Sequence, residues 1–342
     1  MHRLLLMMVA STVLIATLST TALPAAACAG LIGSNGAVNL GRTTTLAAYH
    51  DGVEHYVTAF KFLGGGGQFG TLIPLPGIPT SVERGGGWTL QRLQLETDPP
   101  QLAARSALPS SAVAEGDVRV VLQTRVDALD LTVLEGGSRG VAAWATDHGF
   151  RLSPDAPEVL EFYARRSPIF LAAIFDADAA TERGQAVGDG TPIQITIPTA
   201  NPWVPLRILG LGKQTTDRVE ADVYLLTDRL PAMLPNPTGG LALTHSAPAR
   251  KQLLDDLRSD ENMGWIPQDG WLTKLKIDTA AGNLAFDLAV DASGRGEPSR
   301  LAAGLEVAQE TVPSPASLPL APLAAALFGL PFVLAAHRRW GR

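Results

Sequence analysis

Two histidines at the end of a predicted hairpin are the leading candidates for metal chemistry. His50 and His55 flank Asp51-Gly52, a dipeptide typical of two-residue β-turns. In such a turn His50 pairs with Val53 and Ala48 pairs with His55, which places both imidazoles on one face, roughly 7–8 Å apart. A zinc site also needs a third ligand and partners that orient the ligands. No nearby residue clearly supplies one, so ordinary strand histidines are the alternative interpretation.

Two tryptophans are candidates for ligand binding. Trp265 and Trp271 lie on either side of a short Pro- and Gly-containing segment. Their faces are large, apolar and rigid, so a pair of them can form a platform for a sugar or a peptide. The alternative is structural, because such residues also fix a loop onto a hydrophobic core.

Acidic and remaining histidine side chains give weaker signals. Asp176, Asp178 and Glu182 offer oxygen ligands, but they lack the glycine and the spaced glutamate of an EF-hand, which favours a solvated loop. His148 lies in the last turn of a predicted helix, where the dipole favours a cation. His245 stands in no motif.

Other chemical motifs are missing. The glycine-rich segment 63–70 lacks the Gly-Lys-Ser/Thr ending of a phosphate loop, and the chain has neither a Gly-x-Ser-x-Gly nor a His-Glu-x-x-His sequence. A catalytic triad can come from distant residues, so a hydrolase with a dispersed site stays an alternative. The sequence therefore indicates no cofactor.

The elements that must position these residues are mostly strands. Alternating or continuous apolar patterns predict strands at 43–50, 53–62, 118–126, 169–175, 191–197 and 217–226, and a late hairpin formed by 272–277 and 284–290. Helices are expected at 138–148, at 248–259, and after Ser153, with Ser153 as N-cap and Pro154 as the first helical residue. Residues 99–117 are rich in Pro, Ser and Ala and could link two lobes. The predicted fold is a strand-dominated α+β domain with a few short helices.

The N-terminus has the pattern of a secretory signal peptide. Residues 1–27 combine Arg3, an apolar stretch and a small-residue cleavage pattern ending at Ala27, which makes Cys28 the expected first mature residue. An uncleaved anchor is the alternative. Acylation of Cys28 would require a Leu-like residue three positions earlier, where Ala25 stands.

The C-terminus has the pattern of a membrane anchor. Residues 318–336 contain no charge and would extend about 28 Å as a helix, close to the hydrocarbon thickness. The basic tail 337–342 should stay cytoplasmic, so the domain 28–310 would be extracytoplasmic. A buried core helix is the alternative. Together with the Pro/Ser linker 311–317, this end resembles a PEP-CTERM sorting signal, although Ser314 replaces the glutamate of that motif.

Charge and cysteine content exclude several classes of protein. The chain has 342 residues, 27 basic and 33 acidic side chains and one cysteine. The two terminal segments contain four of the basic residues and no acid, so the remainder has a net charge of −10. Nucleic acid is therefore not an expected partner. One cysteine excludes an internal disulfide framework and a cysteine-cluster zinc site.

Four stretches of the chain follow the sequence pattern of one bacterial family. They are the start at Ala27-Cys28-Ala29-Gly30, the hairpin from Tyr49 to Gly52 leading to Phe69 through Pro76, Trp144 to Phe150 followed by Tyr163 and Phe170, and Trp271 to Leu275. Together they resemble the bacterial domain of unknown function 2330. Gly70 stands where the family often has Trp, and a second early cysteine is missing. The resemblance implies secretion and frequent membrane anchoring, and no activity.

The sequence thus predicts a membrane-anchored cell-surface protein with a non-enzymatic binding or structural role. Its expected partners are the membrane, through one C-terminal span, and an envelope polymer or surface protein. The alternatives are an extracytoplasmic hydrolase and a metal-dependent surface module.

Overall fold

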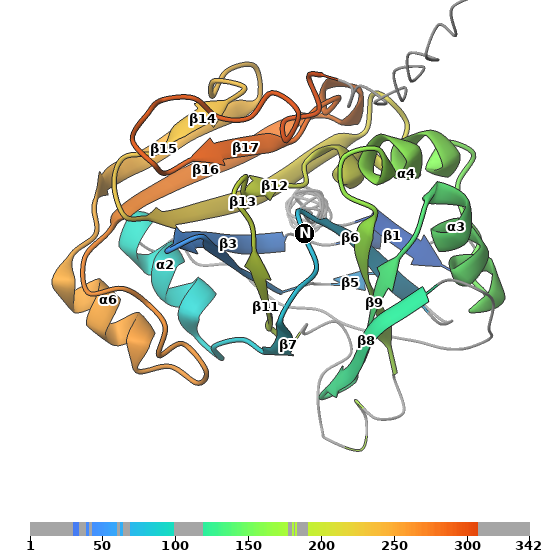
Figure 1. Ribbon diagram of the computed structural model, residues 1–342, viewed down its shortest axis with the longest axis horizontal. Helices are drawn as coiled ribbons and strands as arrows, with labels where there is room; N and C mark the ends of the chain where they lie inside the picture. Colours follow the sequence, from blue (N-terminus) through green and yellow to red (C-terminus); the bar gives the residue numbers. More distant parts are fainter. Residues whose placement is uncertain are drawn as a thin grey trace, which may run out of the picture. The chain divides into compact units, whose positions relative to one another are not determined.

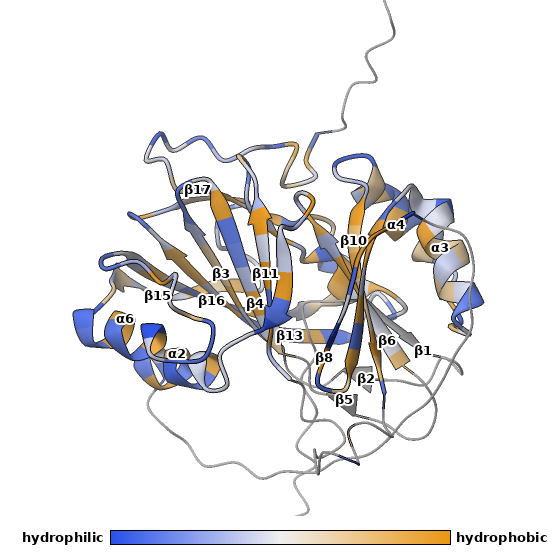
Figure 2. Ribbon diagram, turned by 60° about the horizontal axis from the view of Figure 1, so that its bottom comes forward, coloured by the Kyte–Doolittle hydropathy of each residue, from blue (hydrophilic) through white to orange (hydrophobic). Residues whose placement is uncertain are grey.

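The larger elements of the described part of the chain form four layers. The computed structural model describes residues 30–33, 39–40, 43–59, 62–63, 69–98, 119–176, 180, 182 and 191–306, all within one compact unit, Met1–Ala308. Two sheets pack face to face, and a pair of helices covers the outer face of each sheet (Figure 1, Figure 2). This arrangement confirms the strand-dominated α+β class.

The smaller of the two packed sheets has five strands. Their order is β1 (Gly30–Gly33), β6 (Phe69–Leu75), β10 (Ile169–Phe175), β9 (Leu129–Glu135) and β8 (Arg119–Val126). The continuous apolar sequence of β10 follows from its central place, where both faces are covered. Leu171 packs into the core between the sheets, whereas Phe170 packs beneath the helices on the outer face.

The larger sheet has seven strands and carries the predicted hairpin. Their order is β15 (Leu241–Pro248), β16 (Trp271–Ala280), β13 (Arg218–Thr227), β3 (Thr43–His50), β4 (Val53–Ala59), β11 (Ile193–Pro198) and β7 (Ser81–Arg84). Among these seven described strands, only β13 and β3 pair in parallel. Asp51 and Gly52 both have positive φ angles, as the two-residue turn requires. The predicted pairings of His50 with Val53 and of Ala48 with His55 are confirmed.

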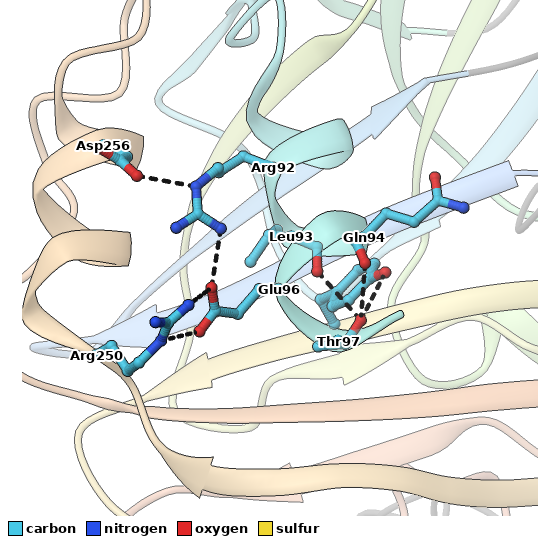
Figure 3. A network of polar contacts seen from close by, with 8 residues as sticks. Arg92, Leu93, Gln94, Glu96, Thr97, Arg250 and Asp256 are labelled. Atoms are coloured by element: carbon cyan, nitrogen blue, oxygen red, sulfur yellow. Dashed lines mark hydrogen bonds and ion pairs between the residues drawn. The ribbon is translucent and has the colours of Figure 1, made fainter. Parts of the chain in front are cut away.

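Helices α2 (Thr89–Thr97) and α6 (Lys251–Arg258) cover the outer face of the larger sheet. A polar network joins them (Figure 3): Arg92 donates to Asp256 and Glu96, and Arg250 also binds Glu96. The helix expected at 248–259 is confirmed for its central residues, Lys251–Arg258. Pro248 belongs to β15 instead. The sequence did not predict α2.

Helices α3 (Ser138–Asp147) and α4 (Ala156–Ala164) cover the outer face of the five-stranded sheet. The prediction of Ser153 as the N-cap of α4 was wrong. The helix begins two residues later, with Asp155 as its N-cap, and Pro157 provides the proline of the first turn. The Ser153 hydroxyl is buried and has no hydrogen-bond partner among the described residues.

The predicted late hairpin was also wrong. Strand β16 already has a neighbour on each side, so the chain after it turns through η2 (Ala281–Asn283) and leaves the sheet. It continues in β17 (Leu288–Asp291), which pairs with β12 (Trp203–Val204) and β14 (Ala232–Leu234). The short helix η1 (Arg207–Gly210) follows β12, and β2 (Asn39–Leu40) pairs with β5 (Phe62–Leu63).

Several predicted segments lie outside the described residues. They are the signal peptide 1–27 with Cys28, the segment 99–117, the linker 311–317, the span 318–336 and the tail 337–342. Within the described part of the chain, no helix combines the length and apolar character needed to cross a bilayer.

Candidate functional site

The two candidate metal ligands share a face of the hairpin but contact different groups. His50 binds Asp228 through Nδ1, and its Nε2 lies 3.2 Å from an Asp51 oxygen. His55 stacks on Trp265 with ring centroids 3.9 Å apart. Burial, with a smaller contribution from His50, lowers the pKa of His55 to about 4. Across the described residues, no three His, Cys, Asp or Glu side chains gather as a metal site would require.

The two candidate binding tryptophans lie against different strands. The Trp265 indole donates a 2.8 Å hydrogen bond to Gln194 Oε1 on β11. The Trp271 indole, at the start of β16, donates to Ser246 Oγ on β15 at 2.9 Å. Each ring is half-buried and has its N–H bonded to the protein. These contacts favour the structural interpretation, in which each ring fixes its own segment.

The weaker candidates also have local contacts. His148 follows α3 as its C-cap, its Nδ1 lies 2.8 Å from the Trp144 carbonyl oxygen, and its ring stacks on Trp144. His245 lies beside a bulge in β15. Asp176 binds Arg125, while Asp178 and most of the glycine-rich segment lie outside the described residues.

A row of three polar side chains crosses three adjacent strands at one end of the larger sheet. Tyr49 on β3 pairs with Thr227 on β13 and with Glu54 on β4, so all three side chains lie on the same sheet face. That face is directed toward the core between the sheets, on the opposite side from His50 and His55. The row lines a partly open cavity of about 10 Å³, roughly the space for one water molecule.

Glu54 is the most unusual member of this row. It is 1 % exposed, and neither carboxyl oxygen has a hydrogen-bond partner among the described residues. Burial raises the pKa of Glu54 to about 8. The Trp203 backbone amide lowers the pKa of Glu54, but by less than burial raises it. This amide does not reach hydrogen-bonding geometry with the carboxyl. An unpaired buried carboxyl destabilises a fold, which makes it a marker of function.

Sequence reasoning missed this row although the signal was present. The register that Asp51-Gly52 fixes also pairs Tyr49 with Glu54. Glu54 alternates with His55 in β4 and therefore points to the side of the buried Tyr56. The contribution of Thr227 depends on the parallel pairing of β13 with β3, which no local pattern indicates.

A second and larger site lies at the N-terminal end of α4. We call it the α4–η2 groove, with a volume of about 270 Å³. Its lining residues are Asp155, Glu158, Val159, Arg207, Gly210, Lys213, Thr215, Ala281, Gly282, Leu284 and Ala285. Arg207 forms an ion pair with Glu158, and the Asp155 carboxylate accepts the Gly212 N–H. Lys213 is half-buried as a residue, and no hydrogen bond or ion pair joins its ammonium to another described residue.

The comparison with protein families gives a clear match. The model described as "Uncharacterized protein conserved in bacteria (DUF2330)" matches residues 23–232, which is more than half of the chain. The chain belongs to the DUF2330 family. The resemblance to DUF2330 that the sequence predicts is thereby confirmed. Among curated proteins, the comparison finds no match.

The DUF2330 match includes Tyr49, Glu54 and Thr227, and also Asp155, Arg207 and Lys213. It ends at β14, before β15, β16 and β17. Because β16 pairs with both β13 and β15, the compact unit of this DUF2330 protein continues past the matched region.

Two solved structures show distant similarity to this DUF2330 chain. Baculovirus P35 is 9 % identical, with a TM-score of 0.40 and coverage of 75 % of this chain and 97 % of that chain. A mutated baculovirus P35 after caspase cleavage is 10 % identical, with a TM-score of 0.39 and coverage of 74 % and 99 %. Both scores are below the level that indicates a shared fold.

Proposed function

We propose that this protein is a non-enzymatic binding module of the cell surface, anchored in the membrane by residues 318–336. Its domain 28–310 is extracytoplasmic and binds a peptide-like part of an envelope polymer or surface protein. The apolar, uncharged C-terminal run with its basic end supports the anchor. The observation that carries the binding role is the α4–η2 groove, whose size and charges suit a small polar ligand.

The charges of the groove favour a zwitterionic ligand. Arg207 and Glu158 compensate each other, whereas Lys213 offers an ammonium without a described partner. Asp155 lies on the same groove and retains acceptor capacity beyond its bonds to the Gly212 amide. A ligand with a carboxylate beside Lys213 and an ammonium beside Asp155 would give each side chain an oppositely charged partner. Val159 and Leu284 provide apolar walls for its body.

The binding role is tested by titrating full-length protein in detergent with short zwitterionic peptides and with neutral oligosaccharides. Peptides should bind, and Lys213→Gln should weaken their binding at least tenfold. Lys251→Gln, an exposed change on α6 away from the groove, is the matched control and should bind as the native chain does. Equal peptide affinity in Lys213→Gln and the native chain would contradict the proposed role of the groove.

The C-terminal segment is further proposed to act as a sorting signal of the PEP-CTERM type. The Pro-rich Val312 to Leu318 segment before the apolar run supports this. The intact mass of protein recovered from cells tests it. Loss of about 25 residues from the C-terminus would support sorting, whereas a full-length mass would indicate a plain anchor.

An extracytoplasmic hydrolase is the second candidate, and Glu54 is the observation that favours it. A buried carboxyl with a pKa of about 8 is protonated at neutral pH and could act as a general acid. Its cavity has room for roughly one water, so a substrate could enter only after the nearby loops move. Hydrolysis of an envelope-derived peptide by the native chain but not by Glu54→Gln would favour this candidate over the binding module.

A further inference from the structure

The ion pair on the wall of the α4–η2 groove joins a fixed cation to a loosely held anion. Arg207 binds Glu158 through Nη2, and both residues line the groove. The Arg207 side chain is 21 % exposed, whereas the Glu158 side chain is 76 % exposed. Water screens an ion pair with so exposed a partner, and such pairs contribute little to stability. Glu158 can therefore leave Arg207 at little cost.

Arg207 is held in position by contacts other than Glu158. Its guanidinium lies over the Phe162 ring, 4.2 Å from the ring centroid, and its backbone N–H donates to the buried Asp287 carboxylate at 3.0 Å. Arg166, which pairs with Asp287, lies over the same ring at 4.1 Å. Because these contacts stay when Glu158 moves, the Arg207 guanidinium is positioned in advance for another anion.

The Arg207 guanidinium also has unused hydrogen-bond donors. A guanidinium has five N–H groups, and among the described residues only Nη2 of Arg207 is bonded, to a single Glu158 oxygen. The other two nitrogens are not buried, so a ligand can reach them. A carboxylate is the anion whose two oxygens match two parallel N–H groups of this fork. Arg207 can therefore hold a ligand carboxylate more completely than it holds Glu158.

Lys213 adds a second cation to the same groove. Its backbone N–H donates to the Gly210 carbonyl oxygen at 3.0 Å, so the turn that contains Arg207 also places Lys213. The charged lining residues are two cations, Arg207 and Lys213, and two anions, Asp155 and Glu158. When Glu158 turns into solvent, two cations remain against one carboxylate. The groove then has the excess positive charge that an incoming carboxylate requires.

We propose that the α4–η2 groove recognises the free C-terminal carboxylate of its peptide ligand through Arg207 and Lys213, and that Glu158 is an internal competitor that occupies Arg207 until the ligand arrives. This inference rests on the peptide-binding role proposed above for the same groove. As the peptide binds, its carboxylate replaces that of Glu158 on the guanidinium. A peptide segment without a free carboxylate cannot make this exchange, so the groove selects chain ends over chain interiors.

The test is isothermal titration of the full-length protein in detergent with three probes. Alanyl-leucine offers both charges, N-acetyl-leucine offers only the carboxylate, and alanyl-leucine amide offers only the ammonium. Glu158→Gln should bind the first two about threefold to tenfold more tightly than the native chain, because the competing anion is gone. The amide should gain nothing from the substitution.

Two further variants make the assignment specific. Glu161→Gln is the matched control, because it removes the same charge from the same helix. Glu161 binds Ser138 and Arg165 and does not line the groove, so its loss should leave all three affinities unchanged. Adding Arg207→Lys to Glu158→Gln keeps the positive charge but removes the planar fork, and it should abolish the gain.

The outcomes separate this inference from the proposed function. Equal or weaker carboxylate binding by Glu158→Gln, an equal gain in Glu161→Gln, or an equal gain for the amide would overturn the internal competitor. If Lys213→Gln still weakens peptide binding in that case, the peptide-binding role stands without it. If neither the native chain nor Glu158→Gln binds any of the three probes, both the inference and the proposed role of the groove are wrong.

Discussion

The Tyr163 hydroxyl donates a 2.8 Å hydrogen bond to the Asp287 carboxylate, joining α4 to a residue 124 positions later in the chain. The same carboxylate accepts the Leu206 and Arg207 amides and binds Arg166, whose guanidinium lies over the Phe162 and Trp203 rings. Asp287 lies beyond residue 232, where the family match ends. The residues after the matched region therefore complete the core of the compact unit.

Asp287→Asn should strongly destabilise the protein. Asp287 is fully buried and Arg166 nearly so, so the variant leaves a buried guanidinium without its counter-ion. We expect the free energy of unfolding to fall by about 3 kcal/mol. Urea denaturation followed by circular dichroism measures it. Asp278→Asn breaks an exposed ion pair with Arg218 and serves as the control, which should change stability little. An equal loss in both variants would argue against the central role of Asp287.

Glu96→Gln should weaken the attachment of α2 to α6 and remove part of the acid sensitivity of the fold. Glu96 binds Arg250 and Arg92, and the contact with Arg250 foremost lowers its pKa to about 2. Because this pKa is below the ordinary value of 4.5 for a glutamate, the stabilisation is present above pH 4.5 and disappears as the pH falls toward 2. At pH 7 the variant should lose roughly 1 to 2 kcal/mol.

The control for Glu96→Gln is Glu135→Gln, which removes an ion pair with the exposed Arg119 on β8. Urea unfolding at pH 7, 4 and 3 should show the gap between the native chain and Glu96→Gln closing as the pH falls. A gap that stays constant would indicate that the network contributes through packing rather than charge.

Local signals in the sequence were sufficient for the hairpin and insufficient for α2. Asp51-Gly52 fixes the register of β3 and β4 by itself, so the neighbours of His50 and His55 could be predicted. The N-terminus of α2 instead depends on Asp260, whose carboxylate accepts the Gly87 and Trp88 amides and the Thr89 hydroxyl. A cap supplied from more than 170 residues away leaves no local pattern.

The candidate sites also differ in whether a local sequence pattern could predict them. Tyr49 and Glu54 belong to one hairpin, so their pairing could have been predicted from the turn. The α4–η2 groove combines residues near 155, 207–215 and 281–285, which meet only after the chain has folded. The late hairpin was predicted wrongly for the same reason. Its first strand, β16, already pairs with two other strands. Asp287, in the predicted second strand, instead forms polar contacts with α4 and η1.

Glu54→Gln should stabilise the protein at alkaline pH. Burial raises the pKa of Glu54 to about 8 in the folded chain, from an ordinary value of 4.5. The unfolded chain therefore loses this proton first, and the native stability falls as the pH rises from 4.5 to 8. Glu54→Gln should lack this decline and exceed the native chain by roughly 4 kcal/mol near pH 8.5.

The measurement is urea unfolding at pH 5 in acetate and at pH 8.5 in borate. At pH 5 the two proteins should be similar. Glu83→Gln on the edge strand β7 is the control and should follow the native curve. If the native chain loses no stability between these pH values, the carboxyl of Glu54 has an ordinary pKa.

Trp265→Phe should distinguish a structural tryptophan from a ligand platform. The variant keeps a ring beside His55 but loses the hydrogen bond to Gln194, which is 2 % exposed. An unpaired buried amide oxygen should cost about 1 to 3 kcal/mol of stability. Peptide and sugar binding should not change. Trp271→Phe, whose partner Ser246 is half-buried, should cost less. A loss of ligand binding at native stability would instead support the platform.

A chain that ends at Ser317 should lose its attachment to the membrane. As a helix, the uncharged residues 318–336 would extend about 28 Å, close to the thickness of the hydrocarbon core, and the arginines that follow would favour the cytoplasmic side. The compact unit ends at Ala308, so the deletion removes no part of it and stability should stay the same. In fractionated cells the truncated chain should be soluble and extracytoplasmic, whereas the full chain should sediment with membranes.

Replacing Arg338, Arg339 and Arg342 by Gln in the full chain keeps the apolar run and should retain attachment while weakening the orientation preference. A truncated chain that still sediments with membranes would place the anchor elsewhere, with the uncleaved segment 1–27 as the next candidate.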